Sequence, residues 1–167
     1  STVSPWIVPL EALEPFRVDG PLQEDPEVLP YLKTSGKQNI DLTLEVSLQT
    51  EQRGSGMICR SNFKYMYWNM AQQLAHHTSN GCNLRVGDVM ASGTISGKER
   101  GSFGSMLELS WGGKEPLTLS DGTTRTFLED GDTVIMTAYG EKEGIRVGFG
   151  EARGTILPPM EQKPEDS

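Results

Sequence analysis

The stretch from residue 84 to residue 111, LRVGDVMASGTISGKERGSFGSMLELSW, is the part of the sequence around which the fold is predicted. An apolar run at 89–91 leads into small residues typical of a hairpin, and a glycine-rich loop follows at 97–105. Apolar and polar residues alternate over 106–111, which predicts a strand. Glu108 then projects from the face opposite to the leucines and the tryptophan, beside the glycine loop. That position makes it a candidate functional carboxylate.

The pattern therefore makes Glu108 a candidate site residue, whereas Thr94 of the same stretch gains no such support from the residues alone. The residues alone also allow plainer interpretations. A Glu on the outer face of a strand is commonly a solvated residue, and Thr suits strands and turns without any functional role. The pattern leaves both interpretations open.

Strands are also predicted on both sides of this stretch. The clearest is 40–49, where Ile, Leu and Val alternate strictly with polar residues. Residues 50–56 are predicted to form a hairpin loop, with 57–60 as the returning strand. Further downstream, strands are predicted at 117–119, 124–128, 133–139, 145–150 and 152–157, the first two pairing across Asp121-Gly122.

One helix is predicted, from Phe63 to about Thr78, capped by Ser61 or Asn62 and ended by Asn80-Gly81. Its apolar residues recur at steps of three and four, which predicts a stripe that packs on a sheet. The members of this stripe are Phe63, Met66, Tyr67, Met70, Ala71 and Leu74. Adjacent residues on a helix point about 100° apart, so His76 and His77 are not expected to share a metal.

The fold class that follows is mostly β, a mixed β-sandwich or roll of short strands with one packed helix. At the N-terminal end, a short strand is predicted at 6–8 and a turn of helix at 10–13, before a surface excursion at 19–36. We expect one domain over 1–157 and a polar tail without order over 158–167.

Composition narrows the possible partners and compartments. The formal net charge of −8 disfavours nucleic acid and anionic membranes as partners. No apolar run reaches the length of a membrane-spanning helix, and no signal-peptide pattern is present. Cys59 and Cys82 are predicted to be reduced thiols of a cytoplasmic protein. Glu129, Asp130 and Asp132 are interpreted as a turn, with a cation site as the less favoured alternative.

Several longer motifs resemble the fumarylacetoacetase (fumarylacetoacetate hydrolase) family. They are SNFKYMYW at 61–68, ASGTISG at 91–97 and FGSMLELSW at 103–111, with VSPW at 3–6 and GFG at 148–150. The resemblance covers nearly the whole chain but only the C-terminal part of the family's catalytic domain. Because the chain opens without Met and in what reads as the middle of a strand, we expect it to be a piece of a longer protein.

The resemblance implies a hydrolase that cleaves a carbon–carbon bond in a β-diketo acid, giving fumarate and acetoacetate in the last step of tyrosine breakdown. It implies a homodimer and a divalent cation, Mg²⁺ and/or Ca²⁺, acting as a Lewis acid. A His paired with a Glu activates water in such enzymes, and that Glu corresponds to Glu108. The Thr of the family's ASGTISG motif contacts the substrate, and it corresponds to Thr94. Ser1 matches a Thr of the family's metal site.

The family's catalytic His and metal carboxylates match nothing in this chain, so we expect the chain alone to be inactive. Two other functions stay open. Related enzymes on the same fold hydrolyse acylpyruvates, decarboxylate or isomerise, and the shorter Gly-Asp-Val and Gly-Thr signals fit them too. The chain is also compatible with a non-catalytic β assembly module.

Overall fold

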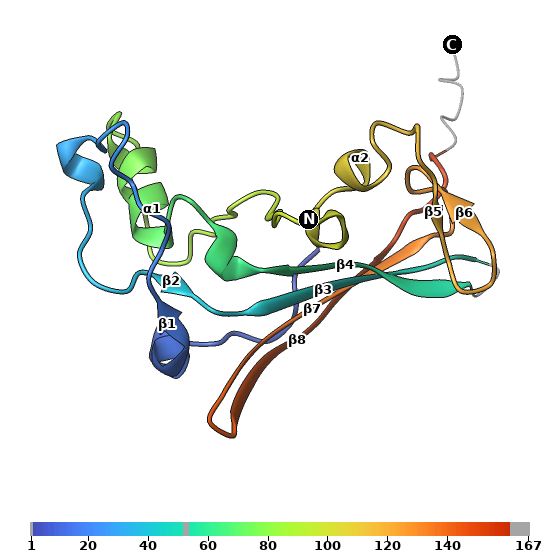
Figure 1. Cartoon of the computed structure of the whole chain (residues 1–167), viewed down its shortest axis with the longest axis horizontal. Coiled ribbons are helices and arrows are strands. Elements are labelled where there is room, and N and C mark those ends of the chain that lie inside the picture. The colour runs from blue at the N-terminus through green and yellow to red at the C-terminus, as the bar shows by residue number, and fades with distance from the viewer. Residues whose placement is uncertain (1, 52–53, 161–167) are drawn as a thin grey trace, which may run out of the picture.

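The computed structural model describes residues 2–51 and 54–160. Its centre is a four-stranded antiparallel sheet in the order β4-β3-β7-β8 (Figure 1). The strands are β3 (Thr43–Gln49), β4 (Ser55–Asn62), β7 (Thr133–Lys142) and β8 (Ile145–Thr155). The predicted mostly β class is confirmed.

Smaller elements gather at the two ends of this sheet (Figure 1). At one end, β1 (Arg17–Val18) pairs with β2 (Asn39–Ile40), near α1 (Met70–Thr78). At the other end, β5 (Leu117–Thr118) pairs with β6 (Thr124–Arg125), near α2 (Met106–Leu109). Short 3-10 helices lie at Leu10–Phe16, Pro30–Leu32, Phe63–Tyr65 and Arg100–Ser102.

The strand predicted at 40–49 is present but divided. Ile40 ends β2, and the backbone N–H of Asp41 donates to the carbonyl of Phe16 at 2.8 Å instead of continuing the ladder. β3 then pairs with β4 on one side and β7 on the other. The alternating residues of β3 point to the two faces of the sheet in turn. Neither face is completely covered, and Leu48 is the one residue of β3 that is fully buried.

The apolar core lies where the sheet meets the first 3-10 helix. It consists of Leu13, Phe16, Ile40 and Leu42. Gly140 of β7 lies directly under the Phe16 ring, where a methyl group would approach the ring to 2.7 Å. A glycine there lets an aromatic side chain rest on the strand backbone.

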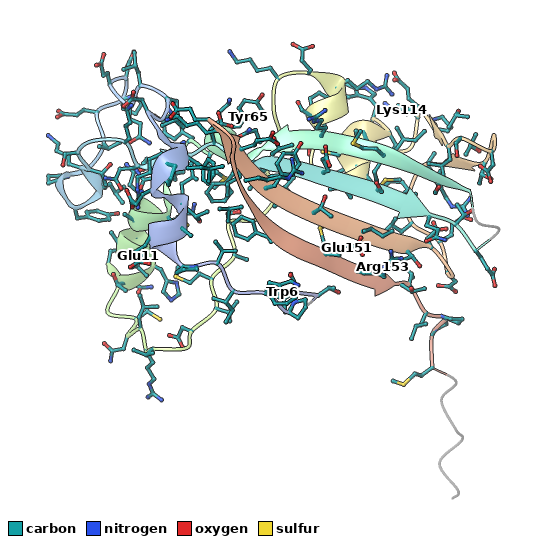
Figure 2. The ribbon with its side chains drawn as sticks, turned by 90° about the horizontal axis from the view of Figure 1, so that it is seen from below. Trp6, Glu11, Tyr65, Lys114, Glu151 and Arg153 are labelled. Carbon is teal, nitrogen blue, oxygen red and sulfur yellow. The ribbon has the colours of Figure 1, made fainter. Side chains whose placement is uncertain are left out.

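The strand predicted at 6–8 is wrong. Residues 2–9 form an extended strap without ladder pairing, because Pro5 and Pro9 lack the N–H that a sheet strand needs. The strap runs beside β8 instead. The Ser4 hydroxyl donates to the carbonyl of Phe149, and Trp6 lies alongside β8 (Figure 2), so close to Gly150 that a methyl group there would clash with the indole.

The helix predicted from Phe63 to Thr78 is also corrected. Residues 63–65 form a 3-10 turn capped by Asn62, and α1 begins at Met70. Asn69 and Gln72 form a capping box, a stronger start signal than Asn62. The stripe expected to pack on the sheet is largely exposed, since Met70 and Leu74 are 37% and 42% accessible. The side chain that α1 buries is Gln72.

The strand predicted at 106–111 is a single helical turn, α2. The sequence Ser105-Met-Leu-Glu108 carries the Ser-x-x-Glu signal of a helix start, and the Ser105 hydroxyl accepts a hydrogen bond from the Glu108 N–H. Trp111 follows with a positive φ of 50°, and the Gly112 N–H donates back to the carbonyl of Leu107. This Schellman ending closes the turn. Residues 89–91, also read as an apolar strand, belong to no strand.

Two further expectations concern the surface. Within residues 2–51 and 54–160, none of the helices has the length and apolar character needed to cross a bilayer. Cys59 is buried, Cys82 is exposed, and both are free thiols, as predicted. Residues 161–167 of the predicted tail lie outside the described part of the chain.

Candidate functional site

A cavity of about 300 Å³ lies where the N-terminal strap, the sheet and the segment 93–104 meet. Its wall includes Ser4 from the strap, Cys59 and Ser61 from β4, Thr94, Gly104, and Phe149 from β8. All five motifs singled out in the sequence, at 3–6, 61–68, 91–97, 103–111 and 148–150, therefore contribute to one concave surface.

The segment that carries Thr94 is tied to the sheet by backbone contacts. The Ser61 hydroxyl donates to the carbonyl of Ile95 at 2.9 Å. Gly104 packs against the same carbonyl, where a methyl group would come within 2.8 Å of both the Ile95 oxygen and the Thr94 methyl carbon. The glycine-rich composition of this loop is thus required for close approach of two backbone segments, and the approach fixes the position of Thr94.

Glu108 lies half-buried on α2, with its carboxylate held by two serine hydroxyls. Ser96 Oγ donates to the carboxylate, 3.0 Å from Oε1 and 2.9 Å from Oε2. Ser105 Oγ donates to Oε2 at 2.8 Å. Hydroxyl donors aimed at a carboxylate restrict its rotation.

Thr94 and Glu108 lie in the same corner of the molecule but not on the same wall. Thr94 lines the cavity, whereas Glu108 is not part of its lining. They are joined through Ser96, two residues after Thr94, which bonds Glu108. Burial, reinforced by the nearby negative charge of Glu108, raises the pKa of the Cys59 thiol on the cavity wall. The carboxylate therefore acts electrostatically on the cavity from behind its wall.

The predicted metal residue, Ser1, lies outside the described residues. In the part of the chain that the structure describes, no three His, Cys, Asp or Glu side chains gather as a metal-ligand group. The described residues therefore do not supply the oxygen shell that Mg²⁺ or Ca²⁺ requires.

The acidic turn at 129–132, the less favoured cation site, is occupied by a protein cation. Asp132 is fully buried and accepts two hydrogen bonds from Arg125, from Nε at 2.9 Å and from Nη2 at 3.1 Å. Glu129 completes the cluster, 3.3 Å from the same guanidinium. This cluster joins β6 to the start of β7 and has a structural explanation.

A larger cavity of about 670 Å³ lies at the opposite end, between α1 and the 3-10 helix Pro30–Leu32. Its walls are mainly apolar and aromatic, including Leu29, Tyr67 and Trp68. His76 is at its edge, with Nδ1 3.1 Å from the Tyr31 hydroxyl. Neither Thr94 nor Glu108 lines it, and we place the candidate site at the smaller cavity.

Sequence reasoning missed Cys59, Ser96 and Ser105 as neighbours of the site. A signal for Ser105 was present, because Ser-x-x-Glu marks a helix start and brings those two side chains together. Ser96 and Cys59 carry no comparable local signal, since tertiary structure alone brings Ser96 to Glu108 and Cys59 to the cavity wall.

Comparison with known proteins adds the family. Residues 1–157 match the model of the fumarylacetoacetate (FAA) hydrolase C-terminal domain. The chain is 55% identical to the fumarylacetoacetase of Homo sapiens over 161 residues, which is 96% of this chain and 38% of that protein. Fumarylacetoacetase of Oryza sativa subsp. japonica is 52% identical and that of Dictyostelium discoideum 47%, with similar coverage. The chain thus spans little more than a third of these relatives' length.

Proposed function

The chain belongs to the fumarylacetoacetate hydrolase family, and on that premise we propose that it forms the C-terminal part of a carbon–carbon bond hydrolase. The proposed reaction adds water to 4-fumarylacetoacetate, a β-diketo acid, and releases fumarate and acetoacetate. The relatives' names support the substrate. The observation that carries the proposal is a carboxylate oriented by two hydroxyls, Glu108, behind a cavity lined by Thr94.

In this proposal Glu108 acts as the carboxylate of a Glu–His pair. The His comes from a part of the protein outside this chain and removes a proton from the attacking water. Glu108 orients the imidazole and stabilises its protonated form, as the acid of a catalytic triad does. The Thr94 hydroxyl contributes a hydrogen bond to the bound substrate at the cavity wall.

The proposal includes a divalent cation, Mg²⁺ or Ca²⁺, as a Lewis acid for the dicarbonyl. Ser1 is proposed as one contributor to its surroundings. The remaining oxygen ligands come from outside this chain.

We also propose a homodimer in the cytoplasm. The two free thiols, Cys59 and Cys82, fit a reducing compartment. Exposed apolar side chains along α1, among them Met70 and Leu74, fit a chain that packs against further protein.

The test uses a protein of the relatives' length that carries this chain, called here the long form. Turnover is followed as loss of the diketo-acid absorbance. Glu108→Gln keeps the shape of the side chain but removes its charge, so we expect kcat to fall by about 10²–10⁴-fold with metal affinity little changed. Calorimetry with Mg²⁺ and Ca²⁺ measures that affinity. A Glu108→Gln long form with unchanged kcat would remove Glu108 from the catalytic machinery.

Acylpyruvate serves as the comparison substrate. Turnover of acylpyruvate without turnover of 4-fumarylacetoacetate would favour a related hydrolase of the same fold. A long form that turns over neither would favour the non-catalytic assembly module.

A further inference from the structure

We propose that Ser96 and Ser105 are positioning residues that orient the Glu108 carboxylate and leave its Oε1 atom to accept one further donor. The inference rests on the proposed function, in which Glu108 accepts a hydrogen bond from a histidine. It concerns how this chain prepares Glu108 for that partner.

Each serine hydroxyl is itself oriented by a backbone N–H. Ser96 Oγ accepts from the Gly104 N–H at 3.0 Å, and Ser105 Oγ accepts from the Glu108 N–H at 3.3 Å. A serine hydroxyl has one proton to donate. With one lone pair of each hydroxyl engaged by a backbone N–H, the proton is directed at the carboxylate in both cases.

The two carboxylate oxygens of Glu108 accept unequal numbers of hydrogen bonds from the two serines. Oε2 accepts from Ser105 at 2.8 Å and lies 2.9 Å from Ser96. Among the described residues, Ser96 at 3.0 Å is the one donor to Oε1. Oε1 shares the single hydroxyl proton of Ser96 with Oε2. An ionised carboxylate can accept about four hydrogen bonds. Oε1 is therefore the atom with free acceptor capacity.

The donors are also neutral, and this preserves the charge of Glu108. Among the described residues no Lys, Arg or His nitrogen forms a salt bridge with it. Arg100, the nearest cation on the N-terminal side of Glu108, pairs with Glu115 and donates to the carbonyl of Leu109 at 3.2 Å. A guanidinium at Glu108 would neutralise the carboxylate, whereas hydroxyls orient it and leave its negative charge available to an imidazolium.

The scaffold behind Ser96 is held on both sides. Ser61 of β4 holds the carbonyl of Ile95, and the Gly97 N–H donates to the carbonyl of Ser102 at 2.9 Å. Ser96 thus transmits the position of the sheet to α2. A loss of the hydroxyl should misplace the carboxylate without unfolding the segment.

The experiment measures kcat and KM of the long form with 4-fumarylacetoacetate. We expect Ser96→Ala to lower kcat by about 10- to 100-fold, the scale of a misplaced catalytic group, with KM changed by less than about twofold. Ser105→Gly should act similarly, because Gly is accepted at a helix N-cap but has no hydroxyl. Ser105→Thr retains cap and hydroxyl and should restore most of the activity. Ser92→Ala is the matched control, since within the described residues that exposed hydroxyl bonds the neighbouring Gly93 carbonyl alone.

A double-mutant cycle separates this inference from the proposed function. In the Glu108→Gln background, Ser96→Ala should add little further loss, because its partner charge is already gone. If Glu108→Gln itself leaves kcat unchanged, the proposed function fails. If Glu108→Gln is impaired but Ser96→Ala and Ser105→Gly are normal, only this inference fails. Equal losses in kcat for both backgrounds, or losses confined to KM, would likewise overturn it.

Discussion

At the residue scale, single side chains couple the sheet to the candidate site. Cys59 on β4 is 4% exposed and lines the cavity. The negative charge of Glu108 contributes to the raised pKa of the Cys59 thiol, after burial. Asp41 performs a comparable task at the other end of the sheet. Its carboxylate accepts from Asn62 Nδ2 at 2.6 Å and from Lys64 Nζ at 2.9 Å, holding the chain where β4 leads into the next turn.

The burial of Cys59 predicts two classes of thiol. Cys82 is exposed and should react rapidly with a disulfide reagent such as dithionitrobenzoate, whereas Cys59 should react at least about 10²-fold more slowly, because it needs local opening of the sheet. Cys82→Ser isolates the slow thiol. In denaturant both thiols should react at one rate. Two equally fast thiols in the native chain would contradict the burial of Cys59.

The environment of Asp41 predicts part of the acid stability. Burial raises the pKa of Asp41, but the hydrogen bonds from Lys64 and Asn62 and the charge of Lys64 outweigh it and hold the pKa below 3.8. A lowered native pKa stabilises the fold above pH 3.8, and this contribution is lost as pH falls through the native pKa.

Urea unfolding between pH 5 and pH 2 measures the loss. Asp41→Asn should show a flatter fall of the unfolding free energy below about pH 4 than the unmodified chain. Asp19→Asn, which removes an exposed carboxylate and so makes the same change in net charge, serves as the control. Parallel curves for all three proteins would show that Asp41 does not contribute.

At the scale of elements, α1 buries a polar side chain and exposes an apolar stripe. Gln72 is 1% exposed and makes a paired-amide contact with Gln23, with Nε2 2.6 Å from the Gln23 oxygen. Its Nε2 also donates to the carbonyl of Leu32 at 2.9 Å, and its Oε1 accepts from the Asn69 N–H at 3.0 Å. This amide joins α1 to the surface excursion at 19–36.

We therefore predict that two neighbouring truncations in α1 lower the free energy of unfolding by different amounts. Gln72→Ala leaves buried partners unsatisfied and should cost about 1–3 kcal/mol. Leu74→Ala removes a side chain that is 42% exposed and should cost less than about 0.5 kcal/mol in this chain, as surface changes do.

The measurement is the free energy of urea unfolding of the chain. The amphipathic pattern by itself would predict the reverse, with about 2–5 kcal/mol for the leucine as a core residue. A larger cost for Leu74→Ala than for Gln72→Ala would therefore show that α1 packs its apolar stripe after all.

At the scale of the whole molecule, the chain is open. Its accessible surface is 11985 Å², whereas a compact monomer of 18.3 kDa is expected to expose about 8100 Å². Large apolar side chains are exposed on the strap, on α1 and in the segment 86–90. This surface agrees with a chain that completes its packing, and on our proposal its active site, with further protein.

The corresponding prediction compares the chain with the long form. Water attack on a ketone needs a base, and the leaving enolate needs positive charge nearby. Because the described residues supply Glu108 without such partners, we expect the chain alone to show no turnover and no tight divalent-metal binding, and the long form to show both. Absorbance assays and calorimetry on the two proteins measure this. Turnover by the chain alone would place the catalytic groups within it.

The sequence by itself determined the elements whose signals are local. Strict alternation predicted β3, an Asp-Gly turn predicted the β5–β6 hairpin, and a run of β-branched residues predicted β7. The long motifs also determined the family, and with it Glu108 and Thr94 as candidates. In each case neighbours along the chain carry the information, through strand periodicity, turn conformation or a specific string of residues.

Residues 106–111 carry two competing local signals, since they alternate like a strand while the Ser105–Glu108 cap and the Schellman ending at Trp111 stabilise a helical turn. Only the tertiary structure decided the rest. The stripe of α1 predicted burial, but no described part of the chain covers it, so Gln72 became the buried residue. Ser96 reaches Glu108 because β4 and the Gly104 backbone bring it there. Burial and side-chain partners depend on segments distant in sequence, and periodicity cannot encode which of them meet.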